Sequence, residues 1–248
     1  MVPIQTPNPT PSRPAPAPAA GLLASRLLAE AGFAHAFPER TVTDDELARA
    51  VGIDAGRAIV QLKQVHGGGA LDASDASGAN GREGDALVAR GGPRAVAVGV
   101  RVADCVPVLV ADEATGDVAA IHAGWRGVTR GIVTAAIERL GKRGRLVAAI
   151  GPCIGPCCFE VGRDVGEQIA LAAGGARVVA SCGDEKVGAK VYVDLRAAVR
   201  AQLVAAGVNV ARIDDVPGCT KHEPGRFHSF RRDGARSGRM LAAIATRA

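Results

Sequence analysis

The chain has 248 residues, which suits one domain with a large core, and 48% of them are hydrophobic but only 3% aromatic. The formal net charge is +5, and the segment from Cys219 to the end holds seven basic and two acidic residues, which accounts for the whole excess. Because single-strand nucleic-acid platforms need aromatic rings for the bases, this basic segment favours a small anion such as phosphate over nucleic acid.

Cysteine usage indicates a reducing compartment, and hydropathy predicts no membrane-spanning segment. The chain has six cysteines and shows no basic segment followed by an apolar run near its start. No stretch free of charges and helix breakers is long enough to span a bilayer. We therefore expect free thiols in a soluble, cytoplasmic protein with no membrane partner.

The first residues differ in composition from the rest. Seven of the 14 prolines lie between Pro3 and Pro18, in a stretch with little apolar bulk. Such a composition cannot bury a core, so we predict a disordered tail over residues 1–20 and one globular domain over residues 21–248. The domain is expected to open with a helix over Leu22–Ala31 that Gly32 ends.

Runs rich in Val, Ala and Ile predict the strands of the domain. They are Ala58–Val65, Ala95–Val102, Val106–Ala111, Val118–His122 and Leu146–Ile150. Apolar residues at helical spacing predict one helix over 132–140, ended by Gly141, and another over 195–203, capped by Asp194. A turn around Asp112–Asp117 would make part of the sheet antiparallel. The predicted fold class is α/β, a single-domain sandwich of mixed β-sheet with flanking helices.

Three residues that bind soft or borderline metals stand where predicted strands run into loops. They are His66 in KQVHG, Cys105 in VADCVPVLV and His122 in AAIHAGWRG. Their separations of 39 and 17 residues (105 − 66 and 122 − 105) are too long for a zinc knuckle. Three ligands of mixed nitrogen and sulfur match the catalytic pattern, which leaves one position open for chemistry. On spacing alone, a buried cysteine and two ordinary histidines fit equally well.

Five ordered segments resemble one known family. KQVHG, GVRVADCVPVLVAD, IHAGWRG, IGPCIGPCCFEVG and FHSFRRDGARSGRM are similar to signature stretches of the laccase-domain family, the multicopper polyphenol oxidase-like proteins. The resemblance runs from about Gly32 to the C-terminus. In that family the residues that match His66, Cys105 and His122 bind zinc. The resemblance therefore implies Zn²⁺ as the cofactor, with copper as the less favoured metal.

The resemblance also implies an activity. Several members are purine nucleoside phosphorylases that act on adenosine, inosine, guanosine and methylthioadenosine, and that also deaminate adenosine. Purine nucleosides and phosphate are then the expected partners, and we expect a monomer or a small homo-oligomer. Substrate contacts are predicted from Gln64, Cys157, Phe159 and Ser229, of which Cys157 and Phe159 belong to the IGPCIGPCCFEVG loop.

Catalytic roles follow from the needs of the two reactions. Phosphorolysis needs cationic donors for phosphate, and we predict Arg231 and Arg232 for this role, with Ser229 as a hydroxyl donor. The alternative is that these arginines pair with Asp233 and other surface acids. Deamination needs a proton shuttle, for which Asp104 is the candidate, although an aspartate there can equally cap a turn.

A group of cysteines remains outside these roles. Cys153, Cys157 and Cys158 are close enough to suggest a second metal site or a redox pair, but two Gly-Pro dipeptides favour a tight turn with small buried residues. His222 and His228 depart from the family pattern, and either contribute to the site or replace aromatic rings on a loop.

Other functions stay open on the sequence. Cys105 could be the nucleophile of a cysteine hydrolase with His122 as base, and one form of this hypothesis is the editing of peptidoglycan precursors. Copper oxidation of phenols needs many histidines, commonly in His-x-His pairs, whereas this chain has five histidines and no such pair. A nucleic-acid-binding protein that uses the basic segment is the non-enzymatic alternative.

Overall fold

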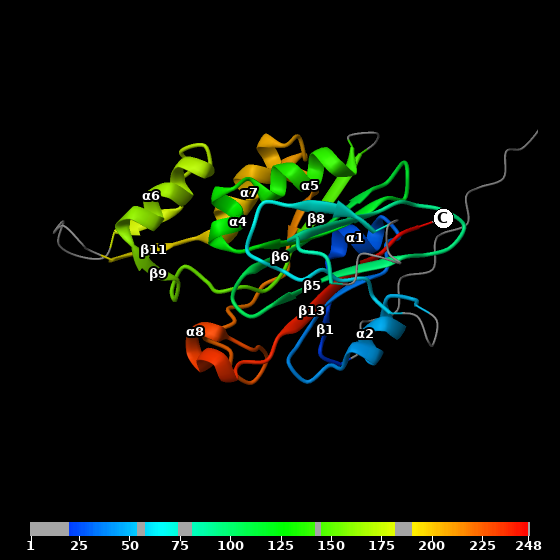
Figure 1. The fold of residues 1–248 in the computed structure, drawn as a ribbon, viewed down its shortest axis with the longest axis horizontal. Helices are drawn as coiled ribbons and strands as arrows, with labels where there is room; N and C mark the ends of the chain where they lie inside the picture. Colours follow the sequence, from blue (N-terminus) through cyan, green and yellow to red (C-terminus); the bar gives the residue numbers. More distant parts are fainter. Residues whose placement is uncertain (1–19, 54–57, 74–80, 142–144, 182–189, 248) are drawn as a thin grey trace, which may run out of the picture.

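The computed structural model describes residues 20–53, 58–73, 81–141, 145–181 and 190–247. The proline-rich segment that we predict as a disordered tail lies outside the described residues, except for Ala20. Within the described part, strands and helices alternate along the chain and pack in layers (Figure 1).

A six-stranded mixed sheet forms the centre of the fold. Its strands run in the order β12 (Ile213–Asp215), β8 (Leu146–Ile150), β6 (Val106–Asp112), β7 (Val118–Ala123), β4 (Ala86–Ala89) and β3 (Ala70–Asp72). β6 pairs antiparallel with both β7 and β8. β12 is parallel to β8, and β3 is parallel to β4. The predicted strand-turn-strand around Asp112–Asp117 is therefore confirmed.

Two smaller sheets contain the other strands. One has the order β1 (Leu22–Leu23), β2 (His35–Pro38), β13 (Met240–Ala245) and β5 (Ala97–Val102), and the other has the order β10 (Val179–Ser181), β11 (Lys190–Val193) and β9 (Glu160–Gly162). β13 pairs along its whole length with β5. This pairing brings the basic C-terminal segment next to the strand that leads into Cys105.

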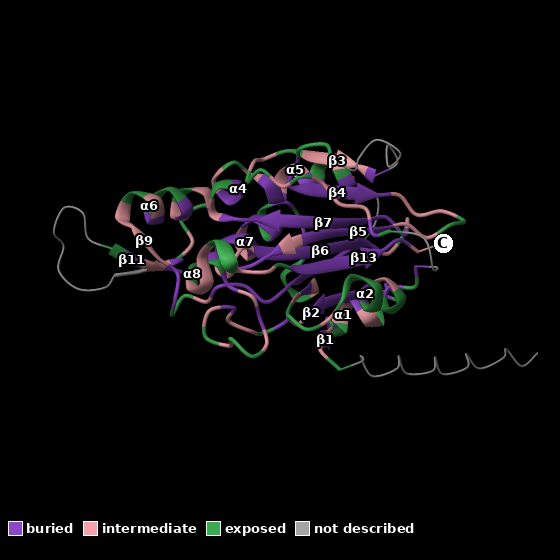
Figure 2. Ribbon diagram, turned by 60° about the horizontal axis from the view of Figure 1, so that its bottom comes forward, coloured by how far each residue is buried: buried purple, intermediate pink, exposed green. Residues whose placement is uncertain are grey.

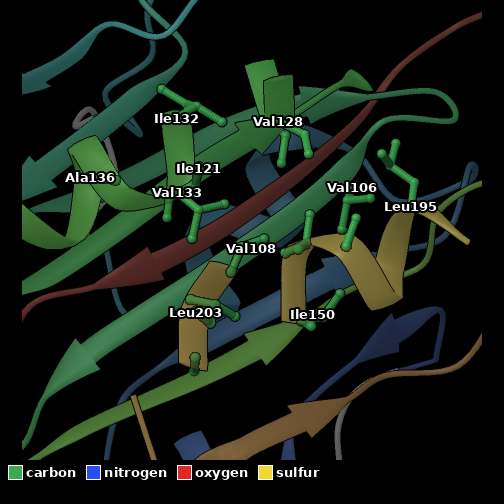
Figure 3. Close-up of a cluster of buried hydrophobic side chains, with 14 of the residues drawn as sticks. Val106, Val108, Ile121, Val128, Ile132, Val133, Ala136, Ile150, Leu195 and Leu203 are labelled. Atoms are coloured by element: carbon green, nitrogen blue, oxygen red, sulfur yellow. The ribbon is translucent and has the colours of Figure 1, made fainter. Parts of the chain in front are cut away.

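Strand alternation buries both faces of the six-stranded sheet. In β6, Val106, Val108 and Val110 belong to one buried core, whereas Leu109 and Ala111 belong to another. In the first core, shown in Figure 3, the sheet meets helices α4 (Trp125–Thr129), α5 (Ile132–Leu140) and α7 (Leu195–Ala205). In the second core, it meets β5 and β13 of the four-stranded sheet. Both cores are mostly aliphatic, as the composition predicts.

Helices cover the outer faces of the six-stranded sheet and of the four-stranded sheet. Helix α2 (Asp44–Ala50) lies against the four-stranded sheet (Figure 2). Its Leu47 shares a buried cluster with Ala36 and Leu241. Other α-helices in the described ranges are α1 (Arg26–Glu30), α6 (Arg163–Ala172) and α8 (Phe230–Asp233). The predicted α/β sandwich of mixed sheet with flanking helices is confirmed. Across the described ranges, no helix combines the length and apolar content needed to cross a bilayer.

The expected helix over Leu22–Ala31 is shorter than predicted. It begins at Arg26, because the side chain of Ser25 caps it by accepting a hydrogen bond from the Leu28 amide. The residues before the cap, Leu22–Leu23, pair with β2 as strand β1.

The expected strand over Ala58–Val65 is an extended segment rather than a regular strand. It makes two isolated bridges, from Val60 to Val98 and from Lys63 to Glu83. These bridges tie the segment to β5 and to the residues before β4, and so position His66 at its end.

Candidate metal centre and pocket

The three predicted metal ligands lie together. Ligand atoms of His66, Cys105 and His122 are all within 4.8 Å of one another. The two imidazole rings meet edge to face, with centroids 4.8 Å apart and planes at 78°. Two nitrogens and one sulfur at this separation form a ligand set for a borderline metal such as zinc. We call these three residues the His-Cys-His cluster.

Strand ends carry each ligand to this point. Cys105 lies in the turn between β5 and β6, and His122 lies near the end of β7, opposite Pro107 of β6. His66 follows the extended segment and has a left-handed backbone, with a φ of 56°. A positive φ is strained in a residue other than glycine, so contacts around His66 must hold this turn.

A glycine beside the ligands leaves them room. A Cβ atom on Gly124 would lie 3.0 Å from Sγ of Cys105 and 3.2 Å from Cδ2 of His66. Because a side chain here would crowd two of the ligands, a glycine at the residue that precedes α4 suits the cluster.

A buried carboxylate that no motif in the sequence marks organises the cluster. Asp85 is 1% exposed, and its Oδ1 lies 2.7 Å from Nδ1 of His122. The same carboxylate accepts hydrogen bonds from the backbone amides of Val65, His66 and Gly67 at 3.3, 2.9 and 2.6 Å. It therefore orients the His122 ring and holds the strained His66 turn. Its only sequence signal is its place just before the buried strand β4.

Hydrogen bonds within the cluster stabilise a thiolate. Burial alone would raise the pKa of Cys105, but hydrogen bonds from His122 and His66 lower this pKa to about 7. Burial alone would lower the pKa of His122, but hydrogen bonds with Asp85 and Cys105 raise it to about 9. The thiolate is the form of cysteine that binds metals, so these contacts prepare Cys105 as a ligand.

Replacing Asp85 with asparagine should weaken metal binding about 10- to 100-fold, the usual effect of losing the outer partner of a ligand histidine. Asparagine has nearly the same volume but lacks the negative charge that faces His122 and the three amides. Competition against a chromophoric chelator measures the affinity. The control is Asp117→Asn, which removes a buried carboxylate that pairs with Arg90 at 3.0 Å. Equal metal affinity in the two variants would contradict the role of Asp85.

A cavity of about 490 Å³ opens onto the His-Cys-His cluster, and all three cluster residues line it. This volume is in the range of small-molecule sites. The other walls combine three arginines with apolar side chains: Arg101, Arg231 and Arg239, with Leu62, Ile154, Phe159 and Phe230. The cavity therefore offers both cationic donors and apolar surface beside the cluster.

Asp104 and Ser229 organise the start of α8. Asp104 has a φ of 98°, and its carboxylate accepts hydrogen bonds from Oγ1 of Thr220 and from the Arg231 amide, both at 2.6 Å. Ser229 is fully buried, does not line the cavity, and accepts from the Arg232 amide at 3.3 Å. Because both oxygens of Asp104 are engaged, the geometry favours the capping role over the proton-shuttle role. Asp104 lines the cavity as the residue that positions Arg231.

The two predicted phosphate-binding arginines have different surroundings. Arg231 lines the cavity, donates from Nη1 to the carbonyl of Glu160 at 2.8 Å, and stands 5.4 Å from the centre of the Phe159 ring. Arg232 does not line the cavity. Its guanidinium pairs with Asp233 and donates to three backbone carbonyls, those of Thr220, Lys221 and Phe227. For Arg232, the structure thus favours the alternative in which it pairs with Asp233.

The four residues predicted to contact substrate differ in whether they line the cavity. Gln64 and Phe159 line the cavity, whereas Cys157 and Ser229 do not. The Gln64 amide is fixed by Arg101, whose carbonyl accepts from Nε2 at 2.8 Å and whose amide donates to Oε1 at 2.7 Å.

The cysteine-rich turn is only partly buried. Cys153 and Cys158 are buried, as expected, but Cys157 is exposed. Cys157 and Cys158 lie together with Cys219 and His222, a grouping that the sequence did not predict.

A mixed α/β sandwich with a His-Cys-His ligand cluster on the wall of a cavity defines a candidate metal-binding protein. The chain belongs to the multi-copper polyphenol oxidoreductase laccase family, whose family model matches residues 41–247.

Two relatives and one solved structure illustrate the match. The chain is 41% identical over 164 residues to adenosine deaminase RL5 from an unknown prokaryotic organism. This aligned stretch covers 64% of this chain and 61% of that protein. It is 36% identical over 202 residues to a purine nucleoside phosphorylase of Deinococcus radiodurans. That alignment covers 80% of this chain and 74% of that protein. Protein NMB0706 of Neisseria meningitidis has a similar structure, with a TM-score of 0.76, 29% identity, and coverage of 92% of this chain and 100% of that chain.

Proposed function

We propose that this chain is a zinc-dependent purine nucleoside phosphorylase that also deaminates adenosine. The observation that carries the proposal is the His-Cys-His cluster on the wall of a cavity that also holds three arginines. The names of the two relatives, an adenosine deaminase and a purine nucleoside phosphorylase, support one activity each.

The ligand set supports zinc as the metal. Two imidazoles and one thiolate suit Zn²⁺, and three protein ligands match catalytic zinc sites, which keep one position open. Asp85 behind His122 is the kind of outer partner that such sites use. A zinc ion held by the cluster would supply Lewis-acid catalysis beside the cavity.

The cavity residues suit a nucleoside and phosphate. Arg231 and Arg239 can each offer two parallel N–H donors to phosphate oxygens. Each guanidinium stands 5.4 Å from a ring centre, Arg231 at Phe159 and Arg239 at Phe230, so the rings help to hold the donors. Phosphate fixed in this way would be oriented toward the anomeric carbon as the base departs.

A cysteine hydrolase is the second candidate, and one observation favours it. Cys105 shares a hydrogen bond with His122, and the hydrogen bonds around its buried thiol lower its pKa to about 7, as an activated nucleophile requires. In that function Cys105 must stay free of metal, whereas in ours it is a ligand. Copper-dependent phenol oxidation has less support, because five histidines without a His-x-His pair are too few for a multicopper centre.

Zinc-loaded protein should convert inosine and phosphate to hypoxanthine and ribose 1-phosphate, and should convert adenosine and water to inosine and ammonia in phosphate-free buffer. Chromatographic separation of the products measures both reactions. A chelator should abolish both, and added zinc should restore them. If the zinc-loaded protein converted no purine nucleoside, the proposal would be wrong.

A further inference from the structure

A second group of metal-ligating side chains lies outside the His-Cys-His cluster. Cys157 and Cys158 come from the turn that follows β8, and Cys219 and His222 come from the segment between β12 and α8. One ligand atom from each of the four lies within 4.8 Å of the other three. We call these residues the Cys3His cluster.

The separations within the Cys3His cluster match a tetrahedral zinc shell. Zn–S bonds of about 2.3 Å and Zn–N bonds of about 2.0–2.1 Å place neighbouring ligand atoms about 3.5–3.8 Å apart. Sγ of Cys157 lies 3.7 Å from Sγ of Cys158, 3.9 Å from Sγ of Cys219 and 3.3 Å from Nδ1 of His222. A disulfide requires about 2.05 Å, so these sulfurs are not bonded to one another, and their separations are compatible with a shared ion.

The backbone around the cluster leaves room for sulfur. The amide of Gly155 donates to Sγ of Cys219 at 3.2 Å, a contact that favours the thiolate. A Cβ atom on Gly155 would lie 3.2 Å from Sγ of Cys157 and 3.3 Å from Sγ of Cys219. The two segments are also tied by a bridge between Cys153 and Cys219, with the Thr220 amide donating to the carbonyl of Cys153 at 3.0 Å.

We propose that the Cys3His cluster is a structural zinc site that joins the turn after β8 to the segment before α8. Four protein ligands close the shell, whereas the His-Cys-His cluster has three and leaves a position open. When Zn²⁺ binds, the three thiols release three protons and His222 binds as a neutral imidazole. Cys157 and His222 are exposed, so the ion can enter from solvent.

Both joined segments supply walls of the cavity. Phe159 follows the cysteine pair, and Arg231 follows the segment that holds Cys219 and His222. Asp104 contacts both segments, because its carbonyl accepts from the Ile154 amide at 2.9 Å and its carboxylate accepts from the Thr220 hydroxyl at 2.6 Å. The structural zinc thus fixes the separation of these walls, and its loss should raise KM for the nucleoside while the His-Cys-His cluster keeps its metal. The expected rise in KM rests on the proposed function, whereas the metal-binding test of the Cys3His cluster does not.

Cobalt binding to the Cys105→Ala protein tests the site, because this variant removes the His-Cys-His cluster from the measurement. We expect about one Co²⁺ per chain, with thiolate-to-cobalt charge-transfer absorption that added zinc displaces. Adding Cys219→Ser should remove one of three thiolates and lower the absorption per bound ion by about a third. Adding Cys153→Ser, the same chemical change at a buried cysteine outside the cluster, should leave the spectrum unchanged.

His222→Ala provides a second test at an exposed position, in case Cys219→Ser does not fold. It should weaken cobalt binding about ten-fold or more with an unchanged circular dichroism spectrum. Failure of folded Cys105→Ala protein to bind cobalt near one ion per chain would overturn the proposal. An equal spectral change in the Cys153→Ser and Cys219→Ser variants, or a disulfide within the cluster under reducing purification, would overturn it as well.

Discussion

Replacing Cys105 with alanine should lower phosphorolysis and deamination together by about a thousand-fold or more. Lewis-acid catalysis contributes several kcal/mol, and each 1.36 kcal/mol corresponds to about a factor of ten in rate. The variant should also contain one zinc ion fewer per chain than the unmodified protein, because the His-Cys-His cluster loses its only sulfur. Elemental analysis and the two product assays on the same preparation measure these effects.

Cys153→Ala is the matched control for this experiment. Cys153 is fully buried and belongs to neither cluster, so its loss should leave zinc content and both activities unchanged. A Cys105→Ala protein that kept all its zinc and lost its activity would favour the cysteine hydrolase, in which Cys105 is the nucleophile.

Replacing Arg231 with alanine should slow phosphorolysis about ten-fold or more and raise the phosphate concentration that the reaction needs. The reason is the loss of a charged hydrogen bond to phosphate, worth about 1.5–3 kcal/mol. Deamination should be largely spared, because it consumes water and no phosphate. Assays with inosine at varied phosphate, and with adenosine in phosphate-free buffer, separate the two effects. Arg231→Lys should restore only part of the rate, since lysine cannot bind two oxygens in one plane.

Arg232→Ala is the contrasting variant. Its guanidinium holds Asp233 and the carbonyls of Thr220, Lys221 and Phe227, so its removal should lower the free energy of unfolding by about 2 kcal/mol. For a chain of this size that corresponds to a fall in Tm of about 4–8 °C. The ratio of the two activities should stay the same. A selective loss of phosphorolysis in Arg232→Ala, and not in Arg231→Ala, would return the phosphate role to Arg232.

The elements that sequence patterns predict best are those with their own periodicity. Leu146–Ile150 is a run of apolar residues and forms β8 with the predicted bounds, and the apolar spacing over 132–140 gives α5. The two-residue strand Leu22–Leu23 has no periodicity, and it exists only because β2 lies beside it. The local apolar pattern therefore predicts a helix that starts too early, because it does not locate the N-cap before Arg26–Glu30.

The residues of the site also differ in how far sequence patterns could predict them. The ligands of the His-Cys-His cluster stand where predicted strands meet loops, and the family resemblance singles them out, since spacing alone fits ordinary residues equally well. Asp85 has no such pattern, since its role depends on the fold bringing it to His122, 37 residues away. Arg231 and Arg232 are neighbours in the chain, and the sequence alone does not distinguish the arginine that lines the cavity from the one that pairs with Asp233.

The contacts of Asp85 also bear on the entropy of metal capture. One carboxylate already immobilises the His66 turn through three consecutive amides and orients the His122 ring, so little conformational freedom remains for an arriving ion to remove. Small zinc domains differ in this respect, because they fold only when the metal arrives, and much of its affinity goes into ordering the chain. Here ordering the cluster should take little of the binding free energy, so a metal ion can enter and leave the His-Cys-His cluster while the surrounding cavity keeps its shape.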